Sequence, residues 1–238
     1  KDDAAGIQVA MRLEAEIQGL NMASKNAADA QSMLDTAEGA LGEVHAALLR
    51  MRELAVQGAN ATVTDSDRDS MQAEVTALEA EIQRIGDNTT WGGQNVLAAD
   101  FTAKFHIGPD AADNITVKIE AIDATAAASG ATGGLGLSGD VTTQANSASY
   151  ITKIDAAISI VSTNRGSLGA VSNRLTSTIN NLDQISVNLS ASKGRIMDAN
   201  FAAETSNLAR SQILQQAATA MLAQANASKS TALTLIQS

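Results

Sequence analysis

Two histidines are the side chains best suited to chemistry in this sequence, and they lie far apart. His45 falls inside a long helical pattern, and His106 falls inside a predicted β-hairpin. A metal site or an acid–base pair needs further ligands or carboxylates at defined spacings, and neither histidine is surrounded by them. We expect both to be ordinary polar side chains, and we expect no metal site and no catalytic residue.

A glycine motif in the second half of the chain formally matches a nucleotide-binding pattern. The stretch GLGLSG, residues 134–139, fits G-x-G-x-x-G. That motif needs a preceding strand and an acidic residue about twenty positions further on, and the sequence predicts neither. We attribute the match to chance, so the sequence predicts no cofactor and a protein that is not an enzyme.

Trp91, in TTWGGQ, raises a sugar-binding alternative. An aromatic ring flanked by glycines can be exposed and can stack on a sugar, whereas the competing interpretation is that it caps the end of a helical core. The alternative function is therefore a cell-surface adhesin or glycan-binding protein. A surface polysaccharide that is acidic would need Lys104, Lys118 and Lys153 to gather locally, because acidic residues dominate the chain as a whole.

The composition excludes some partners and favours one kind of core. The 238 residues include 26 acidic and 16 basic side chains, with a net charge of −10. Phosphate binding needs clustered Lys and Arg, so no nucleic acid is expected as a partner. No run of 18 apolar residues occurs, so no membrane span is expected. With only 2% aromatic residues, Ala, Leu, Ile, Val and Met must fill the core, which suits closely packed helices.

A heptad seam runs through the first quarter of the chain. From Gly6 to Gly58, the residues spaced by three and four are apolar or small, and Glu16 is the only charged one. A seven-residue repeat of this length is typical of a coiled-coil-like rod. Stop signals after Gly58 and an N-cap at Thr64 or Asp65 predict a shorter helix that returns antiparallel. Residues 1–97 are thus expected to form an N-terminal helical arm.

In the middle of the chain, the spacing of apolar residues changes from every three or four positions to every second position. Residues 98–123 are predicted to form a β-hairpin, with Phe105 and Ile107 before the turn and Ile115, Val117 and Ile119 alternating after it. Residues 124–145 are rich in Gly, Ala, Ser and Thr and contain few large apolar residues. We interpret them as an insert or loop rather than a domain.

A second seam follows in the C-terminal part, at Ile151, Ile154, Ile158, Val161, Leu168, Leu175, Ile179, Leu182 and Leu189. It predicts a C-terminal helical arm over residues 146–195. The register fails near Lys193 and Gly194, so residues 196–238 are predicted to form a separate terminal assembly helix. The predicted fold class is mainly α, a long antiparallel coiled-coil-like helical rod with a small β-hairpin.

The terminal helix contains a stretch, ILQQAATAMLAQAN, without any charged residue, Gly or Pro. Its spacing predicts an amphipathic helix with a self-assembly stripe at Ile213, Leu214, Ala217, Met221 and Leu222. Because the seam at 151–189 pairs with the helix of 6–58, we expect the terminal helix to overhang. The chain opens at Lys1 rather than Met, inside a helical pattern, so we expect a preceding segment to be its natural partner.

Five stretches together resemble bacterial flagellin: KDDAAG, NMASKNAADAQSMLDTAEGAL, LLRMRELAVQGAN, LGAVSNRLTSTINNL and ILQQAATAMLAQAN. The resemblance extends over about residues 1–97 and 150–226. It implies a helical core built from both ends of the chain around a minimal middle. It also implies a secreted structural subunit that self-assembles into the extracellular flagellar filament for motility. Contacts that do not close on themselves build such open polymers.

The resemblance further implies a set of protein partners. These are other flagellin subunits in a homopolymer, hook-junction or cap proteins, and a flagellar secretion chaperone that holds the C-terminal helix in a groove before export. A vertebrate innate receptor is expected to recognise Arg50, Leu54 and Glu81, on LLRMRELAVQ and the facing return helix. Leu49 stands where strongly recognised flagellins often carry Gln.

Overall fold

The computed structural model describes residues 4–110, 112–124, 134–198 and 201–236, the last range without the side chains of residues 201, 228 and 230–236. The chain divides into two compact units, Leu13–Ser190 and the combination of Lys1–Arg12 with Ala191–Ser238. The elements in order are α1 (Ala4–Gly58), α2 (Asp65–Asn88), β1 (Thr90–Trp91), β2 (Gln94–Asn95), β3 (Phe101–His106), β4 (Asn114–Ile119), α3 (Gln144–Met197) and α4 (Phe201–Ile236). None of the described helices is long and apolar enough to cross a membrane.

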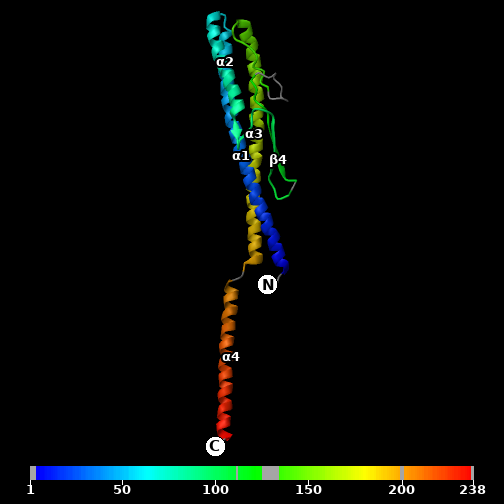
Figure 1. The fold of residues 1–238 in the computed structure, drawn as a ribbon, viewed down its shortest axis with the longest axis vertical. Helices are drawn as coiled ribbons and strands as arrows, with labels where there is room; N and C mark the ends of the chain where they lie inside the picture. Colours follow the sequence, from blue (N-terminus) through cyan, green and yellow to red (C-terminus); the bar gives the residue numbers. More distant parts are fainter. Residues whose placement is uncertain (1–3, 111, 125–133, 199–200, 237–238) are drawn as a thin grey trace. The chain divides into compact units, whose positions relative to one another are not determined.

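Within the larger unit, α1 and α3 run antiparallel and α2 packs beside them (Figure 1). Arg52 Nε lies 2.7 Å from Asp155 Oδ1, and Ser24 Oγ lies 3.2 Å from Asp183 Oδ1. Residue numbers therefore fall along α3 as they rise along α1. The predicted mainly α fold, with long antiparallel helices and a small β-hairpin, is confirmed.

The heptad positions of both helices form the core of this unit. Their side chains are almost completely buried, and small Ala side chains on α1 allow close approach of the helix axes. The buried members on α1 are Leu20, Ala23, Ala27, Ala30, Leu34, Ala37, Leu41, Val44, Leu48, Met51 and Ala55, and those on α3 include Ile154, Ala157, Val161, Leu168, Leu175 and Leu182. On α3, four predicted seam members are only partly buried, namely Ile151, Ile158, Ile179 and Leu189. On α1, Gly6, Val9 and Leu13 are partly buried and Glu16 is exposed.

Arg68 closes the turn between α1 and α2. Its side chain is buried, and its guanidinium donates to the carbonyl oxygens of Gly58 at 2.8 Å and Asn60 at 3.0 Å. The bond to Gly58 satisfies a carbonyl group at the end of α1, and the Asn60 carbonyl also accepts the N–H of Val63 at 3.2 Å. Thr64 caps α2 in a capping box with Asp67, as one of the two predicted caps requires.

A partly buried hydrogen bond joins α2 to α3. The hydroxyl of Tyr150 donates to Glu79 Oε1. Burial raises the pKa of Glu79, which the hydrogen bond partly opposes, and burial together with the carboxylate raises the pKa of Tyr150. The phenol is therefore held protonated as a donor between the two helices.

The predicted β-hairpin is formed by β3 and β4, with Phe101 opposite Ile119 and His106 opposite Asn114. Ile115, Val117 and Ile119 are buried, and the residues between them face outward, as the period of two predicts. A second, two-residue ladder pairs β1 with β2 across Gly92 and Gly93, within the range predicted as the N-terminal helical arm. Both glycines have positive φ, at 58° and 83°, so the turn needs residues without a Cβ.

The predicted insert contributes more to the core than its composition suggested. Leu135, Leu137 and Val141 are buried in the main core. Two glutamines of α2 accept hydrogen bonds from the backbone of this segment. Gln83 Oε1 accepts the N–H of Ala124 at 3.1 Å, and Gln72 Oε1 accepts that of Val141 at 2.7 Å. The GLGLSG stretch thus supplies two buried leucines rather than a phosphate loop, and residues 125–133 lie outside the described residues.

Substitution of Gly86 tests how tightly α2 packs against the segment that follows the β3–β4 hairpin. A Cβ added there would lie 2.5 Å from the carbonyl oxygen of Ile122, which is a backbone atom. We expect Gly86→Ala to lower the free energy of unfolding by about 1–3 kcal/mol, measured by urea denaturation. In the matched variant Gly42→Ala, nothing lies within 4 Å of the new Cβ, so helix propensity alone should add about 0.5–1 kcal/mol. Equal stability of both variants would contradict this packing.

Candidate assembly surface

The smaller unit contains α4, whose residues favour a continuous helix. The 36 residues of α4 include many Ala and no Gly or Pro, so nothing interrupts the backbone hydrogen bonds. Several hydroxyl groups bond back to carbonyls one turn earlier, as Ser206 does to Ala202 at 2.7 Å and Thr219 to Gln215 at 3.0 Å. These polar groups are therefore satisfied inside the helix itself.

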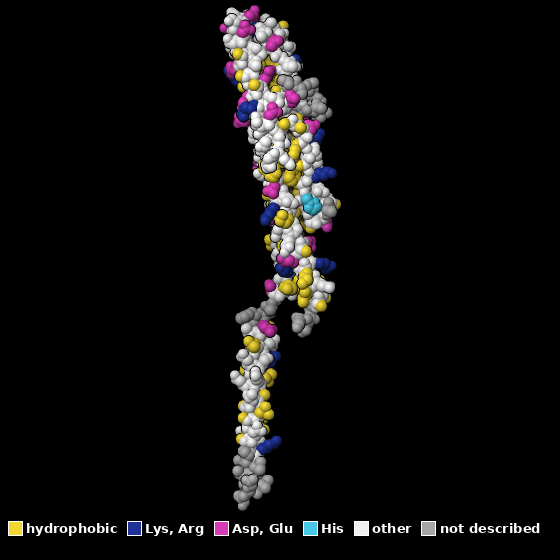
Figure 2. Space-filling view, viewed as in Figure 1, with side chains coloured by type: hydrophobic (Ala, Val, Ile, Leu, Met, Phe, Trp, Pro, Cys, Tyr) yellow, Lys and Arg dark blue, Asp and Glu magenta, His cyan; other side chains and the backbone are white. Residues whose placement is uncertain are grey.

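The predicted self-assembly residues are all exposed on α4. Ile213, Leu214, Met221 and Leu222 are 63–71% exposed, and Ala217 is exposed as well. No described side chain from residue 202 to residue 227 is buried, and Figure 2 shows apolar side chains along much of this helix. Scattered apolar residues on a surface are normal, but several large ones on one helix indicate a contact surface.

Four of the five predicted residues, Ile213, Leu214, Ala217 and Met221, lie within about 100° of one another around the axis of a regular helix. Leu222 lies nine residues from Ile213, which is two and a half helical turns, so these two project on opposite sides. Leu208, also exposed, lies on the side of Leu222. The role of the stripe in self-assembly stays a prediction.

The polar groups on α4 are mostly uncharged. Its charged residues are Glu204, Arg210 and Lys229, and no charged residue lies between the last two. Burying an unpaired charge costs far more free energy than burying a satisfied hydroxyl or an amide. The segment between Arg210 and Lys229 can therefore be covered by protein at low desolvation cost.

The predicted receptor face lies on the larger unit, where α1 packs against α2. Arg50 Nε donates to Glu74 Oε1 at 2.7 Å, and Glu81 accepts two bonds from Arg84, at 2.7 and 2.5 Å. Bonds to Glu74 and Glu53 raise the pKa of Arg50, and those from Arg84 lower the pKa of Glu81. Glu74 and Glu81 are two turns apart on α2, so they share a face.

Leu54 does not belong to that exposed face. Its side chain is only 3% exposed and packs in the core. The heptad seam that buries Met51 and Ala55 also carries this neighbouring leucine inward, between α1 and α2. Leu54 nevertheless lines a surface groove together with Arg50 and Glu74, so its direct contact with a receptor stays a prediction.

The remaining candidates are dispersed over the larger unit. Trp91 is partly buried and packs against the core, so part of its ring is covered, and sugar stacking stays a prediction. His45 lies on α1 with Nδ1 buried and without a hydrogen-bond partner, while His106 is exposed on β3. The structure does not bring the two histidines together.

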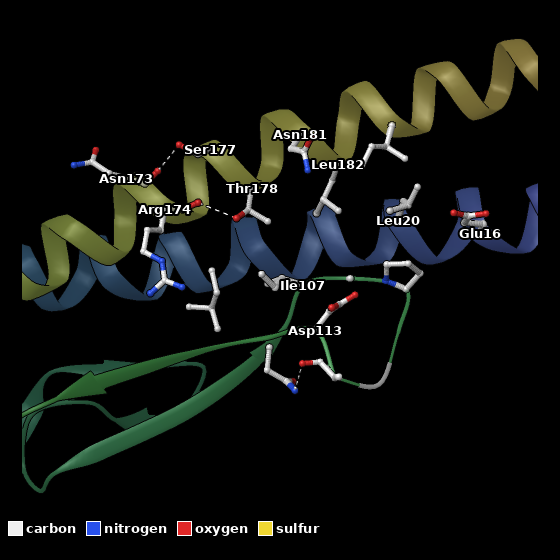
Figure 3. Close-up of a pocket in the computed structure, with 16 residues that line it drawn as sticks. Glu16, Leu20, Ile107, Asp113, Asn173, Arg174, Ser177, Thr178, Asn181 and Leu182 are labelled. Atoms are coloured by element: carbon white, nitrogen blue, oxygen red, sulfur yellow. Dashed lines mark hydrogen bonds between the residues drawn. The ribbon is translucent and has the colours of Figure 1, made fainter.

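A groove of about 790 Å³ lies where the turn of the β3–β4 hairpin meets α1 and α3. Figure 3 shows Ile107 and Asp113 of the hairpin turn facing Leu20 and Leu182 of the two helices. The lining mixes apolar side chains with amides and hydroxyls. Among the residues that the structure describes, no group of three or more His, Cys, Asp or Glu side chains is placed to hold a metal ion.

Comparison with known proteins agrees with these features. Residues 1–102 match the bacterial flagellin N-terminal helical region, and residues 151–236 match the bacterial flagellin C-terminal helical region. A flagellin of Halalkalibacterium halodurans is 40% identical over 237 residues, covering 99% of this chain and 85% of that protein. A flagellin of Bacillus subtilis is 39% identical over 264 residues, covering 99% and 87%. The crystal structure of Bacillus cereus flagellin is 32% identical with a TM-score of 0.55, covering 66% of this chain and 88% of that one.

The fold defines a long-helix protein with a small hairpin and a terminal helix whose apolar side chains are exposed. The matches to both helical regions show that the chain belongs to the bacterial flagellin family. It is a structural subunit of the extracellular flagellar filament and assembles with other flagellin subunits.

Proposed function

We propose that α4 provides the contacts that build the polymer, through Ile213, Leu214, Ala217, Met221 and Leu222. The observation that carries this proposal is the exposure of all five side chains on a helix whose central part has no charge. Covering apolar surface contributes about 25 cal/mol per Å². A helix with this composition therefore gains stability from whatever protein covers it.

The distribution of apolar residues around α4 supports neighbours on more than one side. A helix that is apolar on one face needs one partner, whereas a helix that is apolar all round is stable when it is surrounded. Contacts of this kind between identical chains are heterologous and extend into open filaments. The proposed homopolymer is thus supported by exposed apolar residues on opposite sides of α4, at Ile213 and Leu222.

The same surface suggests the partners that act before and around assembly. An uncovered apolar helix at high concentration in the cell would associate prematurely, so a flagellar secretion chaperone would cover it by helix-in-groove binding. Hook-junction and cap proteins would meet the filament at its two ends. The supporting observation in each case is the exposure of α4.

We propose a structural rather than a catalytic role for the larger unit. His45 and His106 lie on different elements, and the groove near the hairpin turn combines apolar and neutral polar groups with isolated charges.

A second candidate activity is recognition by the vertebrate innate receptor. Arg50 and Glu81 have side chains that are 49% and 46% exposed. Both are held in place by ion pairs with Glu74 and Arg84, which lowers the entropy that a partner would otherwise have to freeze. These two residues are the proposed contacts.

Polymerisation of the complete gene product tests the assembly proposal. Leu214→Ser combined with Met221→Ser removes two apolar side chains worth about 1.5–3 kcal/mol each on burial, so the critical concentration for seeded filament growth should rise about a hundredfold or more. The control pair Gln215→Ser and Thr219→Ser lies on the same helix and should polymerise normally. Sedimentation measures polymer, and circular dichroism checks that the larger unit melts as before. Normal growth of the apolar variant would contradict the proposal.

Binding to the isolated receptor ectodomain tests the second candidate. We expect Arg50→Ala combined with Glu81→Ala to weaken binding about tenfold or more, since charge-assisted contacts are typically worth about 1.5–3 kcal/mol. Arg52→Ala is the matched control, because Arg52 pairs with Asp155 on the α3 side of α1. An unchanged dissociation constant for the double variant, or an equal loss in the control, counts against this face.

A further inference from the structure

One polar side chain interrupts the apolar seam of α3. Asn164 lies between the buried residues Val161 and Leu168 and is itself only 7% exposed. Its Nδ2 atom is buried and has no hydrogen-bond partner among the described residues. An amide donor without a partner inside a protein lowers the free energy of unfolding by about 1–3 kcal/mol. We therefore expect a hydrogen-bond acceptor near Asn164.

An unmatched acceptor lies on the facing helix. Glu38 Oε1 accepts two hydrogen bonds from Arg165, from Nε at 2.9 Å and from Nη2 at 2.7 Å. The other oxygen of the same carboxylate, Oε2, is buried and has no partner in the described part of the chain, although the side chain as a whole is 40% exposed. The carboxylate therefore has one oxygen on the rim of the α1–α3 interface and one directed inward.

The donor and the acceptor lie at the same level of the helix pair, because Arg165 is the immediate neighbour of Asn164. No direct hydrogen bond joins the two atoms. We propose that a trapped water molecule bridges Asn164 Nδ2 and Glu38 Oε2. A water that accepts from the amide and donates to the carboxylate satisfies both groups at once.

Other ligands fit these groups less well. A metal cation is repelled by the amide N–H group, which can only donate. His45 Nδ1 is also buried and unpartnered, but His45 lies seven residues from Glu38 on α1, about 10.5 Å along the axis, which is too far for the same water. Water is the ligand that can accept and donate at this position.

The bridge gives the α1–α3 seam a preferred register. A shift by one heptad would place Gln31 or His45 opposite Asn164 instead of Glu38. The amide would then lose the carboxylate to which the water links it. A single buried polar residue specifies alignment in coiled coils in this way, at some cost in stability.

A double-mutant cycle tests the link between the two residues. Asn164→Leu leaves the inward oxygen of Glu38 without its donor, and Glu38→Met leaves the amide without its acceptor, so each variant should lower Tm by several degrees. The double variant should be less destabilised than the sum, with a coupling of about tenfold in the unfolding equilibrium constant. Pairing Asn164→Leu with Glu43→Met, which removes an exposed acid on the same helix, should give additive effects. Additivity in both cycles overturns the proposal.

The wild-type protein tests the water itself, independently of whether any variant folds. We expect the side-chain NH₂ protons of Asn164 to show a nuclear Overhauser effect to a long-lived water in the full chain, and those of the exposed Asn173 to show none. Absence of this effect at Asn164 overturns the proposal, even with a coupled cycle, because coupling alone would then indicate a direct hydrogen bond.

Discussion

The larger unit depends on the burial of one heptad seam between α1 and α3. Its members are almost fully buried over many helical turns, and the hairpin, α2 and the insert add their apolar side chains to the same core. Burial of apolar surface is the dominant favourable term in folding. With so few aromatic residues, this core relies on the regular repetition of Ala, Leu, Ile and Val along two helices.

The terminal helix differs from this seam because its apolar side chains are not buried within the chain. α4 has similar apolar residues, but no described side chain from residue 202 to residue 227 is buried. Helices in proteins owe most of their stability to tertiary packing rather than to intrinsic propensity. The contrast between a seam that is satisfied within the chain and a helix that is not explains why a filament subunit of this family is built for association with copies of itself.

The fold could be predicted from the sequence because the spacing of apolar residues is regular, both in heptad repeats and in alternating strands. Sequence reasoning predicted the long helices, the hairpin with alternating Ile115, Val117 and Ile119, and a cap at Thr64 or Asp65, of which the structure has Thr64. It missed features that depend on distant contacts. Leu135, Leu137 and Val141 looked too sparse to matter, yet they fill space next to α2, and no local pattern shows that Arg68 reaches back to Gly58.

The candidate sites were harder to predict than the fold. The family resemblance placed Leu54 with Arg50 and Glu81, but its side chain is almost completely buried beside α2. On α4, the short stretch that defined the stripe did not include Leu208, which lies on the side of Leu222. Which side of a helix meets which neighbour depends on distant contacts, and the period alone does not specify it.

Hydrogen–deuterium exchange of α4 in the monomer and in the filament tests the central claim most directly. The account predicts that amides between residues 202 and 227 exchange rapidly in the monomer, because nothing covers the helix, and that polymerisation slows them by orders of magnitude. Amides of the seam around Leu41 and Val44 should be protected in both states. Equal protection of α4 in the monomer and in the filament would show that this helix is already buried within its own chain, which would contradict the account.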